Sequence, residues 1–306
     1  MKVNGYKIKP GVRLHRANLA GANLENADLR QATLFEVNFE GANLTGANLA
    51  GANLKDANLK DANLTGAELA GAYPTNTYLF NADLTGANLT GANLTGANLT
   101  GANLAGANLK DANLTDANLT NAILTEANLR DANLHSAILR LATMPSADLT
   151  DADLTGANLT FTNLAGANLA GANLKDATLT DANLTGANLR HAGLAGTLFY
   201  DANLCSAIMW FANLEKADLR NATLEETDLT NAILYRANLA GANLAGASLK
   251  YATLTDANLT GANLAGANLE IARMSGTNLT RADLTGADLT GAILTGATMP
   301  DGSTHQ

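Results

Sequence analysis

The sequence is poor in cysteine, in aromatic residues and in positive charge. The single cysteine among 306 residues cannot form an internal disulfide, which is typical of a reducing compartment, so we expect a cytoplasmic protein. Lys and Arg number 19 against 28 Asp and Glu, and the net charge of −9 disfavours direct binding to nucleic acid. Residues 1–10 are polar and basic without an apolar run, so neither a signal peptide nor a membrane span is expected.

The dominant feature is a five-residue repeat that runs without insertion or deletion from Val12 to Pro300. Its unit is Ala-Asn-Leu followed by two small or polar residues, as in Ala97-Asn98-Leu99-Thr100-Gly101. Steps of five from Leu14 to Met299 give 58 units, of which 51 hold Leu at this position and 51 hold Ala two residues earlier. A period this regular indicates a solenoid.

Neither a helix nor a straight strand can use a period of five. Leucines five apart would step roughly 140° around a helix and leave no apolar stripe. In a strand they would point to opposite faces. Within one unit, however, Ala, Asn and Leu alternate in, out and in, and the next two residues have turn chemistry. The chain is therefore predicted to bend once per unit, with residue numbers ending in 2, 4, 7 and 9 facing inward.

Tandem Ala-Asn/Asp-Leu-X-X resembles the pentapeptide-repeat family, in a pattern similar to its cyanobacterial members, over about 290 residues. The resemblance implies an all-β fold, a right-handed quadrilateral parallel β-helix with four pentapeptides per coil. The 58 units then give about 14.5 coils (58/4). We expect a single repeat domain at residues 12–300, an N-terminal cap strand at 1–11 and a short tail at 301–306.

One interior segment departs from the repeat. Pro74 occupies a Leu position and should cost the ladder a hydrogen bond, while Tyr73, Tyr78 and Phe80 should point outward. The segment is either a tolerated variation of one coil or a local bulge that presents aromatic residues to a partner.

No arrangement of residues in the sequence predicts catalysis, a cofactor or a metal site. The aspartates of one outward column have basic neighbours, so a charge-balanced, solvated face is favoured over a cation site; they are Asp111, Asp131 and Asp151. His15 and His135 are predicted to lie six coils apart, and Cys205 has no nearby base to activate it. We therefore expect no enzyme activity.

The outward aromatic residues are the best candidates for contact with a partner. The stacking of successive coils places Arg190 beside Trp210, which predicts a cation–π contact, and places Phe211, Asn231, Tyr251 and Ile271 in one column. The first candidate surface is Trp210, Phe211 and Tyr251, and the second is Tyr73, Tyr78 and Phe80. Scattered variation without function is the alternative interpretation.

The function predicted from the sequence is a non-enzymatic scaffold that binds a protein partner through its outer surface. The alternative is a DNA-mimicking inhibitor or protector of DNA gyrase, because some relatives in the family act in this way and the chain is acidic. The absence of the C-terminal helix and loop insertions of those relatives disfavours it. A monomer and an end-to-end or side-to-side dimer are both compatible with the sequence.

Overall fold

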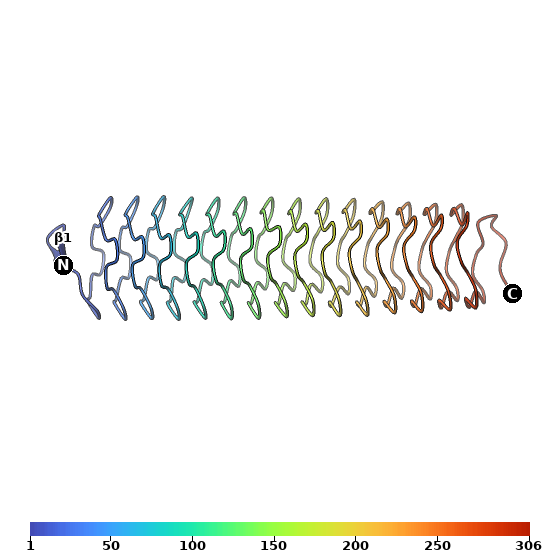
Figure 1. The fold of residues 1–306 in the computed structure, drawn as a ribbon, viewed down its shortest axis with the longest axis horizontal. Helices are drawn as coiled ribbons and strands as arrows, with labels where there is room; N and C mark the ends of the chain where they lie inside the picture. Colours follow the sequence, from blue (N-terminus) through green and yellow to red (C-terminus); the bar gives the residue numbers. More distant parts are fainter. The chain divides into compact units, whose positions relative to one another are not determined.

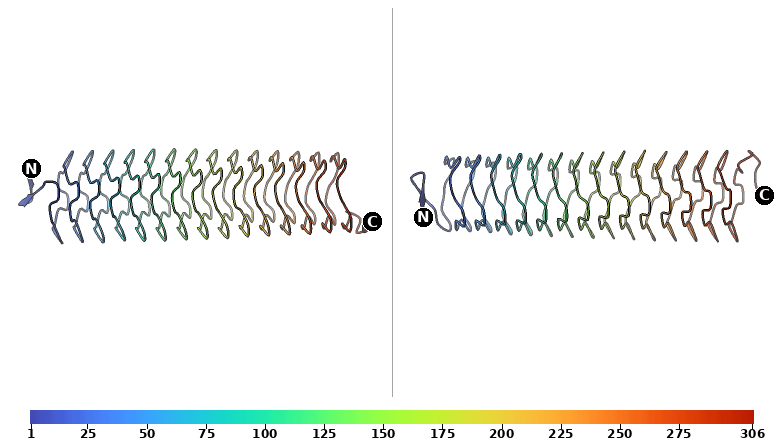
Figure 2. Two further views of the ribbon diagram at one scale, coloured as in Figure 1. Left: turned by 90° about the horizontal axis from the view of Figure 1, so that it is seen from below. Right: turned by 45° about the horizontal axis from the view of Figure 1, so that its top comes forward.

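Parallel β-bridges join residues that lie 20 positions apart, so paired residues are separated by four pentapeptides. In the computed structural model, which describes residues 1–306, these bridges fall into two compact units, Met1–Asp153 and Leu154–Gln306. The bridges of the first unit begin with Arg13↔Thr33, and those of the second begin with Asn158↔Thr178. Within each unit, successive turns of the chain lie side by side (Figures 1 and 2). We call four consecutive pentapeptides a coil, and each unit is an all-β helix of such coils.

The predicted inward positions are confirmed. Leu and Ala side chains at residue numbers ending in 2, 4, 7 and 9 are buried along both units, and most of the leucines have no exposed surface. Burial of each leucine contributes about 1.5–3 kcal/mol, which the ordering of the backbone largely offsets. The inward residues of the last coil, Leu284, Leu289 and Leu294, are only half-buried, because no further coil of the structure covers them.

The hydrogen bonds of one pentapeptide explain its composition. At Leu44, the turn is closed by the N–H of Ala47, which donates to the Leu44 carbonyl at 2.9 Å. The Asn43 side-chain oxygen accepts from both the backbone N–H (3.1 Å) and the hydroxyl (2.7 Å) of Thr45. Gly46 then adopts a φ of 62°, in the left-handed region that Gly and Asn tolerate best. Asn, Thr and Gly therefore recur because each supplies one part of the turn.

The first residues form a hairpin, whereas one cap strand was expected at residues 1–11. Strand β1 (Lys2–Val3) pairs antiparallel with β2 (Tyr6–Lys7). Asn4 and Gly5 join the two strands with φ angles of 47° and 84°, as a two-residue hairpin turn requires. The Asn-Gly dipeptide is the sequence signal that the single-strand prediction overlooked.

The interior break at Pro74 keeps the register of the repeat, so the alternative of a local bulge is wrong. Tyr73 still bridges to Asn53, but its bridge to Asn93 is missing because Pro74 has no N–H to donate. The residues of the segment keep the same sequence of bridges and turns as their neighbours. The predicted loss of one ladder hydrogen bond is confirmed.

The last residues fold back onto the final coil. Thr304 forms an antiparallel bridge with Thr298, after a turn in which Gly302 has a φ of 85°. The N–H of His305 donates to the Ala297 carbonyl at 2.8 Å, and the N–H of Gly296 donates to the His305 carbonyl at 2.8 Å. Residues 301–306 were expected to be a simple tail, but their backbone pairs with one side of the coil. The structure contains no helix with the length and hydrophobicity needed to span a bilayer.

Candidate functional site: an aromatic corner

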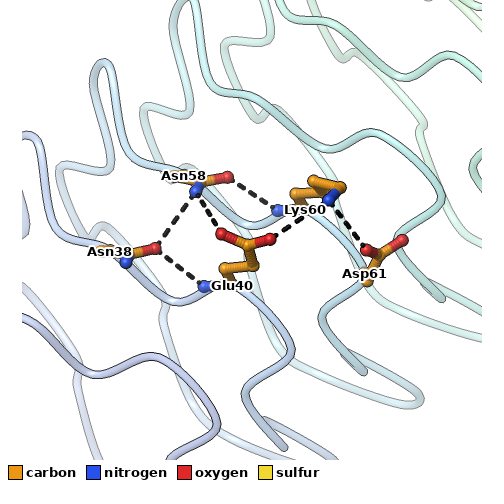
Figure 3. A network of polar contacts seen from close by, with 5 residues as sticks. All are labelled: Asn38, Glu40, Asn58, Lys60 and Asp61. Carbon is orange, nitrogen blue, oxygen red and sulfur yellow. Dashed lines mark hydrogen bonds and ion pairs between the residues drawn. The ribbon is translucent and has the colours of Figure 1, made fainter.

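Many charged side chains of the outer surface are paired with neighbours on adjacent coils. In the network of Figure 3, Lys60 forms ion pairs with Glu40 at 3.1 Å and with Asp61 at 3.5 Å. The amide of Asn58 donates to Asn38 at 3.1 Å and to Glu40 at 3.5 Å. The hydrogen bond that the Lys60 ammonium donates to the Glu40 carboxylate raises the pKa of Lys60, so the ammonium stays charged at neutral pH. This part of the surface satisfies its own polar groups.

The second predicted surface is only partly assembled. Tyr78 and Phe80 stack with ring centroids 6.1 Å apart and planes 11° from parallel. Tyr73 is the most exposed of the three at 54%, but it makes no ring contact with the other two, and Phe80 is half-buried. The three residues therefore do not form a single aromatic patch.

The first predicted surface is larger than expected. In the second unit, the stacking of successive coils gathers cations, aromatic rings and one aliphatic side chain along one edge. We call this surface the aromatic corner; it comprises Arg190, His191, Trp210, Phe211, Lys250, Tyr251 and Ile271. Trp210, Phe211, Tyr251 and Ile271 are all exposed.

Contacts between neighbouring coils hold the aromatic corner in place. The Arg190 guanidinium lies 4.5 Å from the centroid of the Trp210 ring, which confirms the predicted cation–π contact. His191 stacks on Phe211, with centroids 5.2 Å apart and planes 4° from parallel. Sequence reasoning missed His191, although its position one coil before Phe211 was the signal.

A second cation–π contact of the aromatic corner lies at Lys250 and Tyr251, two coils beyond Trp210 and Phe211. The Lys250 ammonium is 5.2 Å from the Tyr251 ring and forms an ion pair with Glu270 at 2.5 Å. The hydrogen bond to Glu270 raises the pKa of Lys250, so the ammonium keeps its charge. The rings of the corner are thus flanked by fixed positive groups.

The backbone of the aromatic corner is unusual for the side chains it carries. His191, Phe211, Tyr251 and Ile271 have φ angles of 58°, 57°, 61° and 57°. Gly, Asn and Asp fill most equivalent positions, because the left-handed region costs other residues roughly 1–2 kcal/mol. A β-branched residue such as Ile271 is a genuine outlier there. Bulky residues at these exposed positions therefore cost stability, as they also do at Leu141 and Phe161.

The family model for pentapeptide repeats matches the chain in segments from residues 13–51 to 262–299 that leave out only residues 74–76, at the Pro74 break. The chain belongs to the pentapeptide-repeat family. The matched segments cover far more than half of its 306 residues. The family resemblance seen in the sequence is confirmed. No curated protein matches the chain.

Several solved structures of pentapeptide-repeat proteins are similar to this one. HetL, from the cyanobacterium Nostoc sp. strain PCC 7120, is involved in the regulation of heterocyst differentiation. It is 40% identical over 74% of this chain and 91% of its own, with a TM-score of 0.30. A pentapeptide-repeat protein from the Arabidopsis thaliana thylakoid lumen is 34% identical over 35% of this chain and 70% of its own, with a TM-score of 0.20. QnrB1, a plasmid-mediated fluoroquinolone resistance protein, is 17% identical over 80% of this chain and 88% of its own, with a TM-score of 0.30.

One side-chain atom of this pentapeptide-repeat protein is buried without a hydrogen-bond partner, although the residue that carries it is only half-buried. The Arg190 Nε atom is buried and makes no hydrogen bond, and no carboxylate pairs with the Arg190 guanidinium. Burying an unpaired polar group costs about 1–3 kcal/mol. Arg190 is therefore a second feature of the aromatic corner that the fold itself does not require.

The remaining groups considered in the sequence are Cys205 and the aspartates of one outward column. Burial raises the pKa of the Cys205 thiol, so the nucleophilic thiolate is scarce at neutral pH. Of the outward column, Asp111 lies 3.8 Å from Lys110, whereas Arg130 pairs at 3.6 Å with Asp148, which lies outside that column. The structure holds no group of three or more His, Cys, Asp or Glu that could bind a metal ion.

Proposed function

We propose that this pentapeptide-repeat protein is a non-enzymatic scaffold that binds a protein partner through the aromatic corner. The observation that carries the proposal is the left-handed backbone at Phe211, Tyr251 and Ile271, where exposed bulky side chains cost stability. Large aromatic residues and arginine are enriched among binding hot spots, and the corner contains both. Exposed Leu141 and Phe161 have the same left-handed backbone elsewhere, so what sets the aromatic corner apart is that its strained residues lie beside Arg190 and Trp210.

The finer architecture belongs to the same proposal. The five-residue register continues without interruption through residues 153 and 154, which supports one repeat domain at residues 12–300. With four pentapeptides per coil, the 58 units make about 14.5 coils (58/4). We infer a right-handed coil because connections between parallel strands are almost always right-handed. The lone cysteine supports a cytoplasmic location.

A binding experiment with matched variants tests the proposal. Trp210→Ala and Phe211→Ala should each leave the melting temperature nearly unchanged, because outward side chains do not hold the core. Each should weaken binding to a partner purified from the native host by about 1 kcal/mol or more, measured by calorimetry. Tyr73→Ala, in the first unit, is the matched control. Unchanged affinity in both corner variants would remove the aromatic corner as the binding surface.

A second candidate function is mimicry of DNA towards gyrase, and the net charge of −9 favours it. The cations beside the acidic side chains weigh against it, because a DNA mimic needs uncompensated negative charge. Lys60, Lys110 and Arg130 each lie within 4 Å of a carboxylate. We therefore rank protein binding through the aromatic corner above DNA mimicry.

A further inference from the structure

One coil of the second unit lacks outward side chains on the face next to the aromatic corner. Along residues 190–196, the outward positions after His191 are occupied by Gly193, Ala195 and Gly196. Gly193 is the one glycine at the position that directly precedes Leu in the repeat. This face of the coil therefore presents little more than backbone.

The conformation of Gly193 does not require glycine. Its φ lies outside the left-handed region, and a Cβ added to it would lie nearest to the Asn173 side-chain oxygen, at 3.3 Å, and at ordinary contact distance from the Asn173 Cα, at 3.8 Å. Asn is the usual residue at this position of the repeat, and elsewhere one Asn stacks on the Asn of the preceding coil, as Asn183 does on Asn163. What glycine provides at residue 193 is therefore empty space, rather than backbone freedom.

The empty space continues as a hollow at the next edge of the coil. It has a volume of about 590 Å³ and is lined by Lys175, Asp176, Ala195, Gly196, Glu215 and Lys216. Ala195 and Gly196 form the floor, and the Asp176 carboxylate reaches over Gly196, since a Cβ added there would collide with its oxygen. The other charged residues stand on the coils before and after. Coils stack about 4.8 Å apart, so the two walls are about 10 Å apart, which is the width that one extended chain fills between two strands. We call the surface from Arg190 to Gly196 the cross-coil groove.

The charges around the cross-coil groove define what it can hold. Glu215 and Lys216 pair with each other at 2.9 Å, whereas Lys175 and Arg190 have no carboxylate partner. A polyphosphate would meet Asp176 and Glu215 in the hollow, and like charges would repel it. A single carboxylate bound at Arg190 would stay outside the hollow and so away from Asp176 and Glu215. Guanidinium–carboxylate pairs are strong because their hydrogen bonds are charge-assisted.

We propose that the cross-coil groove binds an extended segment of a partner protein that carries an Asp or Glu side chain. The carboxylate pairs with Arg190 beside the Trp210 ring, and the following residues of the segment lie over Gly193 and end in the hollow at Gly196. This inference rests on the proposed function, because it names the chemistry of the partner that the aromatic corner receives.

The test uses peptides as probes and Trp210 as the reporter. Trp210 is the only tryptophan of the chain and its ring lies 4.5 Å from the Arg190 guanidinium, so its fluorescence should change when a carboxylate binds at Arg190. Two bead-displayed libraries of random, tryptophan-free octapeptides are screened with the full chain, one with a fixed central Glu and one with a fixed central Gln. The Glu library should yield binders that change Trp210 fluorescence, and replacing their Glu by Gln should weaken binding about tenfold or more.

Variants of the chain separate the groove from the rest of the surface. Gly193→Asn and Ala195→Thr introduce residues that other coils carry at the same positions, so both proteins should fold, as their thermal melts will verify. Each should weaken the selected peptides about tenfold or more because the groove is filled, and Arg190→Thr should do so because the cation is lost. Ala245→Thr, a substitution of the same kind on another column of the second unit, should leave binding unchanged.

Each outcome decides the inference. Equal binding of Glu and Gln peptides, full affinity of Gly193→Asn, or no binder from either library would overturn it. The proposed function fails separately. A host partner that loses affinity for Trp210→Ala but not for Gly193→Asn contacts the aromatic corner without using the groove. A partner that binds both variants with unchanged affinity does not bind this surface at all.

Discussion

A threonine in an alanine position carries a hydroxyl into the core, and the structure shows how that hydroxyl is satisfied. Thr77 donates to the carbonyl of Leu54 at 2.9 Å, and Thr197, Thr227 and Thr277 make the same bond to Leu174, Leu204 and Leu254. Each hydroxyl reaches a carbonyl on the preceding coil. Threonine is tolerated because the carbonyl that closes a turn of the preceding coil, such as that of Leu54, can accept a second hydrogen bond.

Removal of one such hydroxyl gives the first prediction. Thr227→Val keeps the shape of the side chain and loses its 2.8 Å hydrogen bond to Leu204, so the free energy of unfolding should fall by about 1 kcal/mol. Denaturant unfolding of the two proteins measures the difference. Thr255→Val, at an outward position, is the control and should have no measurable effect. Equal stability of Thr227→Val and the parent chain would mean that the buried bond contributes nothing net.

An ion pair at the residue scale predicts how stability depends on pH. Arg220 donates two short hydrogen bonds to Asp218, at 2.8 and 2.6 Å, and this contact lowers the pKa of the Asp218 carboxyl. A lowered folded-state pKa stabilises the fold above the unfolded value of about 3.9, and the stabilisation is lost as pH falls through the folded value.

The corresponding experiment compares the parent chain with Asp218→Asn between pH 7 and pH 2. Solvent screens the half-exposed Arg220, so the variant should be less stable at pH 7 by no more than about 1 kcal/mol. The difference should shrink as pH falls below about 4, because the parent carboxylate then becomes protonated. A difference that stays constant over the whole range would show that the charge of Asp218 does not stabilise the fold.

At the scale of the pentapeptide, the alternation of inward and outward residues was predictable and the backbone of individual turns was not. The period of five requires one bend per unit, so the burial of Leu and Ala followed from the sequence alone. The coil of four pentapeptides came from the family resemblance, and it placed Arg190 against Trp210 correctly. The β1–β2 hairpin, the threonine bonds and the gap at Gly193 were missed. Each depends on local hydrogen bonds or on an absent side chain. The hydrophobic period predicts only which residues face inward, so it carries no information about either.

The left-handed position of the turn leads to a prediction about Ile271. Ile271→Asn should raise the free energy of unfolding by about 1 kcal/mol, because Asn tolerates the φ of 57° that a β-branched residue resists. Thermal or denaturant melts measure the change. Ile293→Thr is the control, since Ile293 is similarly exposed but lies outside the positive-φ positions. A loss of stability in Ile271→Asn would indicate that Ile271 stabilises the fold through packing, and would weaken the case for a functional aromatic corner.

At the scale of the whole molecule, the distribution of charge matters more than the total. The chain carries a net charge of −9, yet at least ten ion pairs within 4 Å join acidic and basic side chains. Duplex DNA presents a continuous negative surface, one charge for about every 1.7 Å of its axis. Acidic columns that are interrupted by basic side chains do not reproduce this surface. We therefore expect the chain to compete poorly with DNA for a DNA-binding protein.

We therefore predict no inhibition of DNA gyrase. A gel assay of plasmid supercoiling, with the protein titrated into the micromolar range, should show the same supercoiled product as the reaction without it. Lys60→Glu and Lys110→Glu remove cations that lie 3.1 Å from Glu40 and 3.8 Å from Asp111, and together they lower the net charge from −9 to −13. This double variant should begin to inhibit if uncompensated charge is what gyrase recognises. Inhibition by the parent chain at the same concentrations would show that the paired cations do not prevent mimicry, and DNA mimicry would then replace scaffolding as the leading function.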